Sequence, residues 1–272
     1  MHITPITSTA DPDLMAANDT ATEPDLERRF GGLRRLYGDH GYARIRSARF
    51  AVVGLGGVGS WCAEALARSG VAALTLVDLD HVAESNINRQ VQALGSTLGQ
   101  AKVRALGARI ADIHPVCEVH GIEEFVDAVN WPGLLPEPVD GVIDACDDGR
   151  AKGALAAWSL ATGTPLVVVG AAGGKRMPQA VQVDDLGCVT HDPLLAALRQ
   201  RLRKHHGASR DGKIGLQCVF SREPVMQPVG PPGPGMAAGN LSCRGYGSSV
   251  VVTAAFGLVA ASLALEFHTA RK

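Results

Sequence analysis

The sequence predicts an α/β protein with a Rossmann-like, mostly parallel sheet, helices on both faces, and a C-terminal extension of strands and helices. Short apolar runs alternate with segments of helical spacing, which is typical of parallel strands buried on both faces. The first apolar run ends in a glycine-rich turn, as in the first strand of a nucleotide-binding sheet. With 46% hydrophobic residues in 272, the chain can bury the core of such a sheet.

Each strand is predicted from a compact apolar run, and each helix from apolar residues spaced three or four apart. Strands are expected at residues 50–53, 73–77, 117–122, 139–145, 165–169, 180–183 and 214–221. Helices are expected at residues 28–46, directly after the glycine turn, and at 102–113, 151–161, 193–206 and 248–267. A proline- and glycine-rich loop covers residues 224–239.

Composition divides the chain into a tail and one domain. Residues 1–26 are rich in Thr, Ala, Asp and Pro without apolar periodicity, and predict a disordered tail. Residues 27–272 are expected to form the domain, with a nucleotide-binding core at 27–175 and a C-terminal substrate or dimer extension at 176–272.

Charge and cysteine usage narrow the class of protein. A net charge of −1 gives no basic excess of the kind that marks many nucleic-acid-binding proteins, although a local patch can still bind phosphates. Six cysteines without a CxxC pair argue against a zinc site and a disulfide scaffold, and favour reduced thiols in the cytoplasm. No signal peptide is expected.

The segment at residues 248–267 is long and apolar enough to raise the question of a membrane span. Its serines, a threonine and a glycine dilute the hydrophobicity, so a buried core helix or a dimer-interface helix is favoured.

Glycines 54, 56 and 59 lie between a strand and a helix, as the dinucleotide fingerprint requires. Such glycines let the backbone approach a phosphate, and the helix N-terminus supplies N–H donors. Asp78 ends the next strand, where a ribose-binding carboxylate belongs. The pattern predicts a nucleotide-binding site. The alternative is a glycine-rich turn that is needed only for tight packing.

Polar residues follow closely behind this carboxylate: Asp80, Asn86, Arg89 and Lys102. An amide, a guanidinium and an ammonium group together suit a triphosphate, because charge must be stabilised as pyrophosphate leaves. A nicotinamide cofactor reacts elsewhere and needs no such cluster, so a dehydrogenase is the weaker interpretation.

Asp147 and Asp148 follow the strand at residues 139–145, at the same sheet edge. Carboxylate oxygens there can hold Mg²⁺ against nucleotide phosphates, and Asp147 is the predicted ligand. The alternative for either aspartate is an N-cap of the helix that begins nearby.

These motifs together resemble the superfamily of ThiF, MoeB and HesA proteins and ubiquitin-activating enzymes. The glycine run, the Asp78–Asp80 strand end, the segment 85–90, Lys102 and the segment 144–148 match in order. The resemblance implies adenylation of a carboxylate with ATP and Mg²⁺ by a homodimer.

Within the superfamily, residues 28–268 resemble the tRNA threonylcarbamoyladenosine dehydratases. The residues that carry this are Arg29–Gly32, Arg35–Gly38, Ser60-Trp61, Ala171–Gly174, Asp192–Leu194 and Cys218–Ser221. The resemblance implies ATP-dependent cyclisation of the modified adenosine beside the tRNA anticodon. Its threonyl carboxylate would be adenylated, and a nitrogen of the same modification would close a ring and expel AMP. The implied partners are the tRNA anticodon stem-loop, a second copy of the chain, and cysteine-desulfurase or sulfur-acceptor proteins, but not DNA.

The resemblance also implies roles for individual residues. Gly56 and Gly57 would face the phosphates and Asp78 the ribose, with Gly54, Gly59 and Asp80 also in the nucleotide site. Asn86, Arg89 and Lys102 would hold the triphosphate, and Asp147 the metal. Arg89, Lys102 and Asp147 would be catalytic, with Asp148 nearby. Arg35, or Arg29 instead, would reach the partner subunit's ATP. The chain departs from the pattern at Met177, where an aspartate is expected.

Three alternatives remain: an activator of a ubiquitin-like sulfur carrier, a nicotinamide dehydrogenase, and a non-catalytic nucleotide-binding scaffold. The basic run at residues 199–213 suits either tRNA phosphates or a solvated helix face. Cys218 suits a sulfur relay less well than simple burial.

Overall fold

The computed structural model describes residues 23–226 and 246–270. Most of the predicted tail at 1–26 and of the loop at 224–239 therefore lies outside the described residues. Within them, the prediction of a Rossmann-like, mostly parallel sheet with helices on both faces is confirmed.

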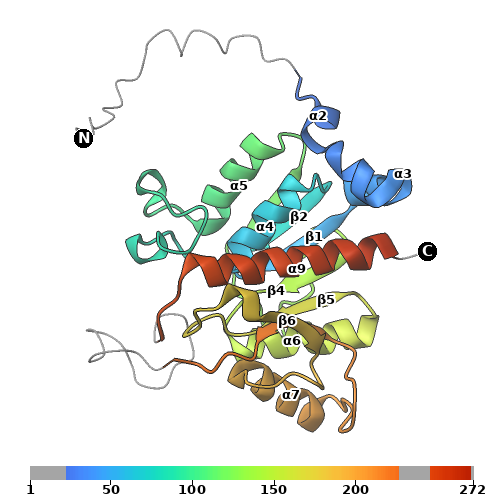
Figure 1. The fold of residues 1–272 in the computed structure, drawn as a ribbon, viewed down its shortest axis with the longest axis vertical. Helices are drawn as coiled ribbons and strands as arrows, with labels where there is room; N and C mark the ends of the chain where they lie inside the picture. Colours follow the sequence, from blue (N-terminus) through green and yellow to red (C-terminus); the bar gives the residue numbers. More distant parts are fainter. Residues whose placement is uncertain (1–22, 227–245, 271–272) are drawn as a thin grey trace.

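One seven-stranded sheet has the order β3-β2-β1-β4-β5-β7-β6 (Figure 1). The strands are β1 (Arg49–Val53), β2 (Ala73–Val77), β3 (Glu118–Ile122), β4 (Gly141–Asp144), β5 (Leu166–Val169), β6 (Val181–Asp185) and β7 (Gln217–Ser221). All neighbours pair in parallel except β6, which is antiparallel to β7 at the edge. Because β7 pairs with β5, the strands of the C-terminal extension continue the sheet of the core.

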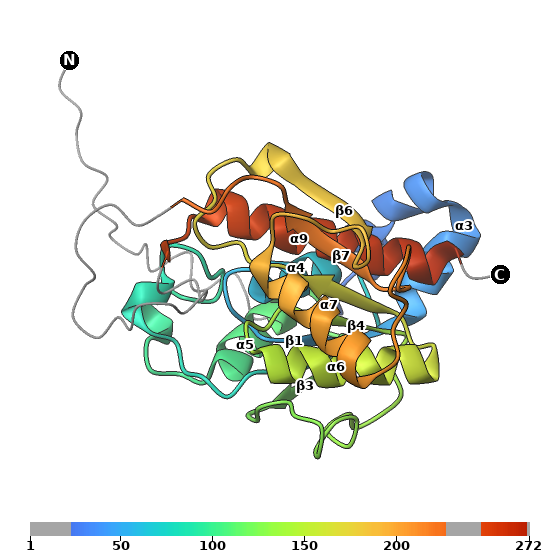
Figure 2. The same ribbon diagram turned by 90° about the horizontal axis from the view of Figure 1, so that it is seen from below.

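Helices cover both faces of this sheet. On one face lie α4 (Gly59–Arg68), α5 (Lys102–Ile113) and α9 (Val250–Ala270), with α2 (Leu26–Phe30) and α3 (Gly32–Ser47) at the end of the layer. On the other lie α6 (Gly149–Thr162) and α7 (Pro193–His205), which pack side by side (Figure 2).

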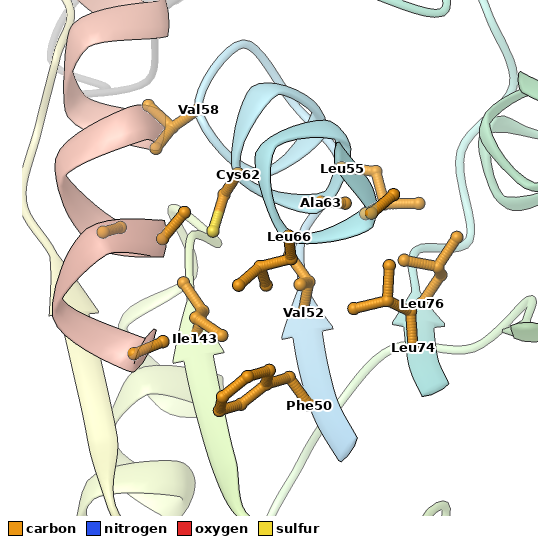
Figure 3. Packing of buried hydrophobic residues seen from close by; sticks show 14 of the residues in the cluster. Phe50, Val52, Leu55, Val58, Cys62, Ala63, Leu66, Leu74, Leu76 and Ile143 are labelled. Atoms are coloured by element: carbon orange, nitrogen blue, oxygen red, sulfur yellow. The ribbon is translucent and has the colours of Figure 1, made fainter. Parts of the chain in front are cut away.

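Alternation along β1 explains why its sequence is continuously apolar. Phe50 and Val52 pack in the core beneath α4 and α9, as Figure 3 shows, whereas Ala51 and Val53 pack on the opposite side with α6 and α7. Helices shield both faces of β1 from water, so apolar side chains are favoured on each face.

Helix α9 begins two residues later and ends three residues later than the predicted segment, and it is long and apolar enough to cross a membrane by length and composition. It packs most extensively on α4, and 44% of its most apolar window is buried inside the protein. A methyl group at Gly257 would lie 3.0 Å from the backbone nitrogen of Cys62, so glycine allows this close packing. The helix is thus partly a core helix, as predicted, although Val251 and Leu258 remain half exposed.

The strand order indicates where along the sheet a ligand can bind. From β1 the chain moves outward through β2 to β3, and then returns to β4 on the other side of β1. The loops after β1 and β4 therefore diverge at their carboxyl ends and leave a crevice, which is where open α/β sheets bind ligands.

Candidate active site

A pocket of about 660 Å³ lies at this crevice. Its walls come from the carboxyl ends of all five parallel core strands and from the loop before α5. The lining includes residues 53, 54, 56–58, 77–80, 86, 89, 90, 102, 124–127, 145–148, 150, 151, 169–172 and 194. The structure thus brings together all the site residues proposed from sequence except Gly59 and Arg35, which do not line the pocket.

Two glycines make the turn after β1 possible. Gly54 has φ +86°, and a Cβ there would lie 2.8 Å from the backbone of Cys146 in the loop after β4. A Cβ on Gly59 would overlap the carbonyl oxygen of Gly54. For these two positions the packing explanation is therefore correct, whatever binds in the pocket.

Gly56 and Gly57 differ from them and from each other. A Cβ on Gly56 would meet no atom of the described residues within 4 Å, and Gly56 lines the pocket, so its open side faces the pocket. A Cβ on Gly57 would lie 3.1 Å from Cγ of Arg89 and 3.2 Å from Cβ of Thr253. Gly57 therefore lets the arginine stem cross the glycine loop.

Asp78 is fixed at the end of β2 by backbone donors. Its Oδ2 accepts a hydrogen bond of 2.6 Å from the Leu55 amide, and its Oδ1 one of 2.9 Å from the Asp80 amide. The carboxylate is thus preorganised beside the glycine loop, where the sequence predicts the ribose contact.

Lys102 is buried at the base of the pocket and forms ion pairs with two carboxylates. Its Nζ is 2.7 Å from Oδ2 of Asp80 and 3.4 Å from Oδ1 of Asp78, and the residue is 5% exposed. The two carboxylates balance the charge of the buried ammonium group. A third partner, such as a phosphate, can still be bound because ammonium carries three donors.

Arg89 is held at the pocket wall by its surroundings. Its Nη1 donates to the Ser85 carbonyl at 2.6 Å and to Oδ1 of Asn88 at 2.9 Å. Its own carbonyl accepts from Nε1 of Trp61 at 2.9 Å. Trp61, which was notable in the sequence only for the family resemblance, thus helps to position Arg89.

Asn86 is 5% exposed in the short 3₁₀ helix η1 (Glu84–Asn86). Its Oδ1 accepts a hydrogen bond of 3.0 Å from the Ala83 amide, which folds the loop. Its Nδ2 donates to no described residue, and Asn86 is one of the residues that line the pocket, so this amide nitrogen can still donate to a ligand.

The two aspartates after β4 have different surroundings. Oδ1 of Asp148 caps α6 by accepting from the amides of Arg150 at 2.7 Å and Ala151 at 2.8 Å, as its alternative interpretation stated. Asp147 is exposed, lines the pocket, and accepts no hydrogen bond from a described residue. One free carboxylate beside a phosphate site suits Mg²⁺, which is usually bound through one or two carboxylates and substrate phosphates.

Phe125 and Arg150 are among the exposed pocket residues that were not predicted from the sequence. Phe125 is 67% exposed, and its loop is held by the side chain of Asn130, whose Nδ2 donates to the Phe125 carbonyl at 2.6 Å. Arg150, in the first turn of α6, forms no ion pair with any residue in the described ranges. Their positions just after β3 and β4 were the available signal, because both strands end at this edge.

Arg35 does not line the pocket and is exposed on α3. The alternative, Arg29, donates to the carbonyls of Ile113 at 2.7 Å and Asp112 at 3.1 Å, at the end of α5 in its own chain. That engagement argues against Arg29, whereas the reach of Arg35 to a second subunit stays a prediction.

The loop after β5 is fixed by two acidic side chains. Oδ2 of Asp192, the N-cap of α7, accepts from the Ala171 amide at 2.9 Å. At the unusual Met177, the carboxylate of Glu223 accepts from the Met177 and Arg176 amides at 3.0 and 2.9 Å. A carboxylate is therefore present near this position, but it comes from a different part of the chain.

The basic run and Cys218 are only partly compatible with the roles considered. Arg199 donates to the Leu186 and Val189 carbonyls, and Arg203 to the Ser209 carbonyl, so both stabilise loops. Lys204 and His205 end α7, about 15 Å along the helix from Leu194, which lines the pocket. Cys218 is fully buried in β7, and burial raises the pKa of its thiol, which argues against a sulfur relay.

Comparison with known proteins shows the family to which the chain belongs. The ThiF family model matches residues 29–271. The tRNA threonylcarbamoyladenosine dehydratase of Escherichia coli strain K12 is 41% identical over 88% of this chain and 92% of that protein. The Haemophilus influenzae protein of the same name is 38% identical over 89% of this chain and 94% of its own length. The crystal structure of the E. coli enzyme, TcdA, in complex with ATP matches with a TM-score of 0.81 and 41% identity, over 92% of this chain and 97% of that one. The chain therefore belongs to the ThiF family, and over nearly its whole length it is similar to the tRNA threonylcarbamoyladenosine dehydratases.

Proposed function

We propose that this protein uses ATP to cyclise N6-threonylcarbamoyladenosine in tRNA, with net loss of one water. The observation that carries the proposal is the pocket itself. A glycine loop with one open side lies beside a fixed carboxylate, a buried ammonium group and a held guanidinium group. This combination occurs in a chain that is similar to the dehydratases over nearly their full length.

Binding of ATP begins with Asp78, whose preorganised carboxylate accepts from the ribose hydroxyls. The phosphates then lie over the open side of Gly56, near the N-terminus of α4. Arg89 and Lys102 hold the β- and γ-phosphates, and Asn86 donates its free amide hydrogens. These cations stabilise the charge on departing pyrophosphate.

Asp147 fits a Mg²⁺ ligand because it is the uncapped, exposed carboxylate of the pair. When bound with ATP, Mg²⁺ would neutralise phosphate charge and favour attack on the α-phosphorus. Asp148 is the N-cap of α6, so its main role is to fix the start of this helix beside Asp147.

The chemical sequence follows from the weakness of a carboxylate as an acyl donor. The threonyl carboxylate attacks the α-phosphorus, the bond to pyrophosphate breaks, and an acyl-adenylate forms. A nitrogen of the same modification then attacks the acyl carbon, loses its proton, and expels AMP. The substrate enters at the pocket mouth, where Phe125 offers a face for stacking a base and Arg150 a cation for an anionic group.

We also propose that the protein acts as a homodimer in the cytoplasm, where tRNA and ATP are available. In support, Leu36 on α3 and both Val251 and Leu258 on α9 are more than half exposed. Such apolar residues suit an interface with a second copy, from which Arg35 would reach the partner's nucleotide. Interaction with sulfur-transfer proteins stays a prediction, without support from Cys218.

The test is to incubate the purified protein with MgATP and tRNA from a strain that lacks the activity. Nucleoside mass spectrometry should show loss of one water from threonylcarbamoyladenosine, with release of AMP and pyrophosphate. If pyrophosphate exchange occurs only with a small carrier protein that ends in Gly-Gly, the chain is a sulfur-carrier activator instead. Binding of ATP without turnover on either substrate would indicate a scaffold.

A further inference from the structure

A fully buried ion pair lies beneath the pocket and has no part in the chemistry described above. Lys152 in α6 and Asp144 at the end of β4 are both 0% exposed, and Nζ lies 3.1 Å from Oδ2. Burial alone would lower the pKa of Lys152, but the charge and hydrogen bonding of Asp144, together with smaller contributions from Cys146 and Asp192, outweigh burial, so that pKa is raised. The lysine therefore carries its charge inside the protein.

The same ammonium group joins the ends of two neighbouring strands. Nζ donates to the carbonyl of Val169, the last residue of β5, at 2.8 Å, and to the carbonyl of Asp144 at 3.4 Å. Val169 and the three residues after it line the pocket. One side chain thus fixes the two strand ends from which both loops of this pocket wall depart.

The carboxylate of Asp144 also binds the loop that carries Asp147. Its Oδ1 accepts from Sγ of Cys146 at 2.8 Å and from the Cys146 amide at 3.3 Å. The backbone of Cys146 in turn lies against Gly54, where no side chain would fit. The pair is therefore connected to the glycine loop and to the predicted Mg²⁺ ligand.

Stability gives a poor explanation for this arrangement. A buried ion pair usually contributes little more than a well-packed apolar pair of similar volume. Lys152 is also the fourth residue of α6, where the positive end of the helix dipole disfavours a cation. The site of the buried Lys152–Asp144 pair is therefore energetically unfavourable, yet it lies directly below the pocket. This position indicates that the pair helps to determine the geometry of the pocket.

We infer that the Lys152–Asp144 pair is a positioning device, which holds the loops after β4 and β5 in the arrangement that binds MgATP. This inference rests on the proposed assignment of the pocket to ATP. It expects that removal of the pair weakens MgATP binding by about 10- to 100-fold, as loss of partners that orient metal ligands commonly does.

The test compares three variants of the full chain. Lys152→Met keeps the side-chain length and removes the positive charge. The double variant Asp144→Asn with Lys152→Met removes both charges, so that no unpaired charge stays buried. Arg109→Met is the matched control, because it breaks an ion pair to the buried Glu64 (Nη2–Oε1 3.0 Å) between α4 and α5, away from the pocket. Calorimetry measures MgATP affinity, and hydrogen–deuterium exchange without nucleotide measures opening of the two loops.

Both Lys152 variants should exchange faster at residues 144–151 and 169–172 and bind MgATP at least tenfold more weakly, while Arg109→Met keeps wild-type values for both. The double variant should regain thermal stability without regaining affinity, and it decides the question if the single variant does not fold. Wild-type affinity and exchange in the double variant would overturn the inference. If the wild type itself does not bind MgATP, the proposed function fails, whereas the exchange comparison still tests the positioning role.

Discussion

Substitution of Gly56 by alanine should separate nucleotide binding from folding. Within residues 23–226 and 246–270 the added methyl group meets no atom closer than 4 Å, and the φ of Gly56 lies outside the left-handed range. Alanine at a compatible position stabilises a protein by about 0.4–1 kcal/mol through the unfolded chain. For a domain of this size the Tm should therefore stay constant or rise by up to about 4 °C.

The same methyl group occupies the side of the loop on which we place the phosphates. Displacement of the phosphates should weaken ATP binding at least tenfold, which corresponds to about 1.4 kcal/mol. Isothermal titration calorimetry and thermal unfolding on the same samples measure both effects. Wild-type ATP affinity in Gly56→Ala would show that the phosphates lie elsewhere and would refute this placement.

Gly59→Ala is the matched control, because its methyl group would overlap the Gly54 carbonyl inside the protein. Overpacking of this kind costs about 1–3 kcal/mol. The Tm should fall by about 2–12 °C at the sensitivity expected for this size. A Tm equal to that of the wild type would mean that the turn relaxes easily and that Gly59 is not needed for packing.

Three further predictions concern single side chains. Arg89→Ala should lower the rate of tRNA-dependent pyrophosphate exchange by about 10²- to 10³-fold with little change in Tm, and a rate within threefold of the wild type would exclude a role for Arg89 in pyrophosphate departure. Asp148→Ala should lower the free energy of unfolding by about 1 kcal/mol in urea titrations, because it removes the cap of α6, and an unchanged value would contradict the capping role. Burial, followed by the charge of Arg46, lowers the pKa of His114 below 6.5, so the unfolded chain takes up the proton first and stability should fall as the pH drops below about 6.5. His114→Gln should make that decline shallower in urea titrations across this range, and an identical slope would contradict the assignment.

The fold was predictable because local signals agreed with one another. The apolar runs that became β1, β2 and β5 are buried on both faces, and the glycine turn marked the functional edge. The pairing of β7 with β5 was not predictable, because Gln217 to Ser221 form a short run whose neighbour is chosen by tertiary packing.

The candidate site was predictable where side chains follow a strand end directly, as Asp78 and Asp147 do. Sequence did not show that Lys102 pairs with Asp80, since that contact depends on how the intervening loop folds. It also gave no sign of the contact of Glu223 with the Met177 amide, which joins residues far apart in the chain. Such contacts arise from the assembled sheet and leave no local pattern.

Transfer of an oxygen isotope tests most directly whether this pocket adenylates a carboxylate. The substrate is tRNA whose threonyl carboxylate carries ¹⁸O at both oxygens, incubated with the protein and unlabelled MgATP in ordinary water. Attack on the α-phosphorus predicts one ¹⁸O atom in the AMP released and none in the pyrophosphate. Unlabelled AMP, or ¹⁸O in inorganic phosphate with release of ADP, would contradict adenylation and the phosphate placement derived from it.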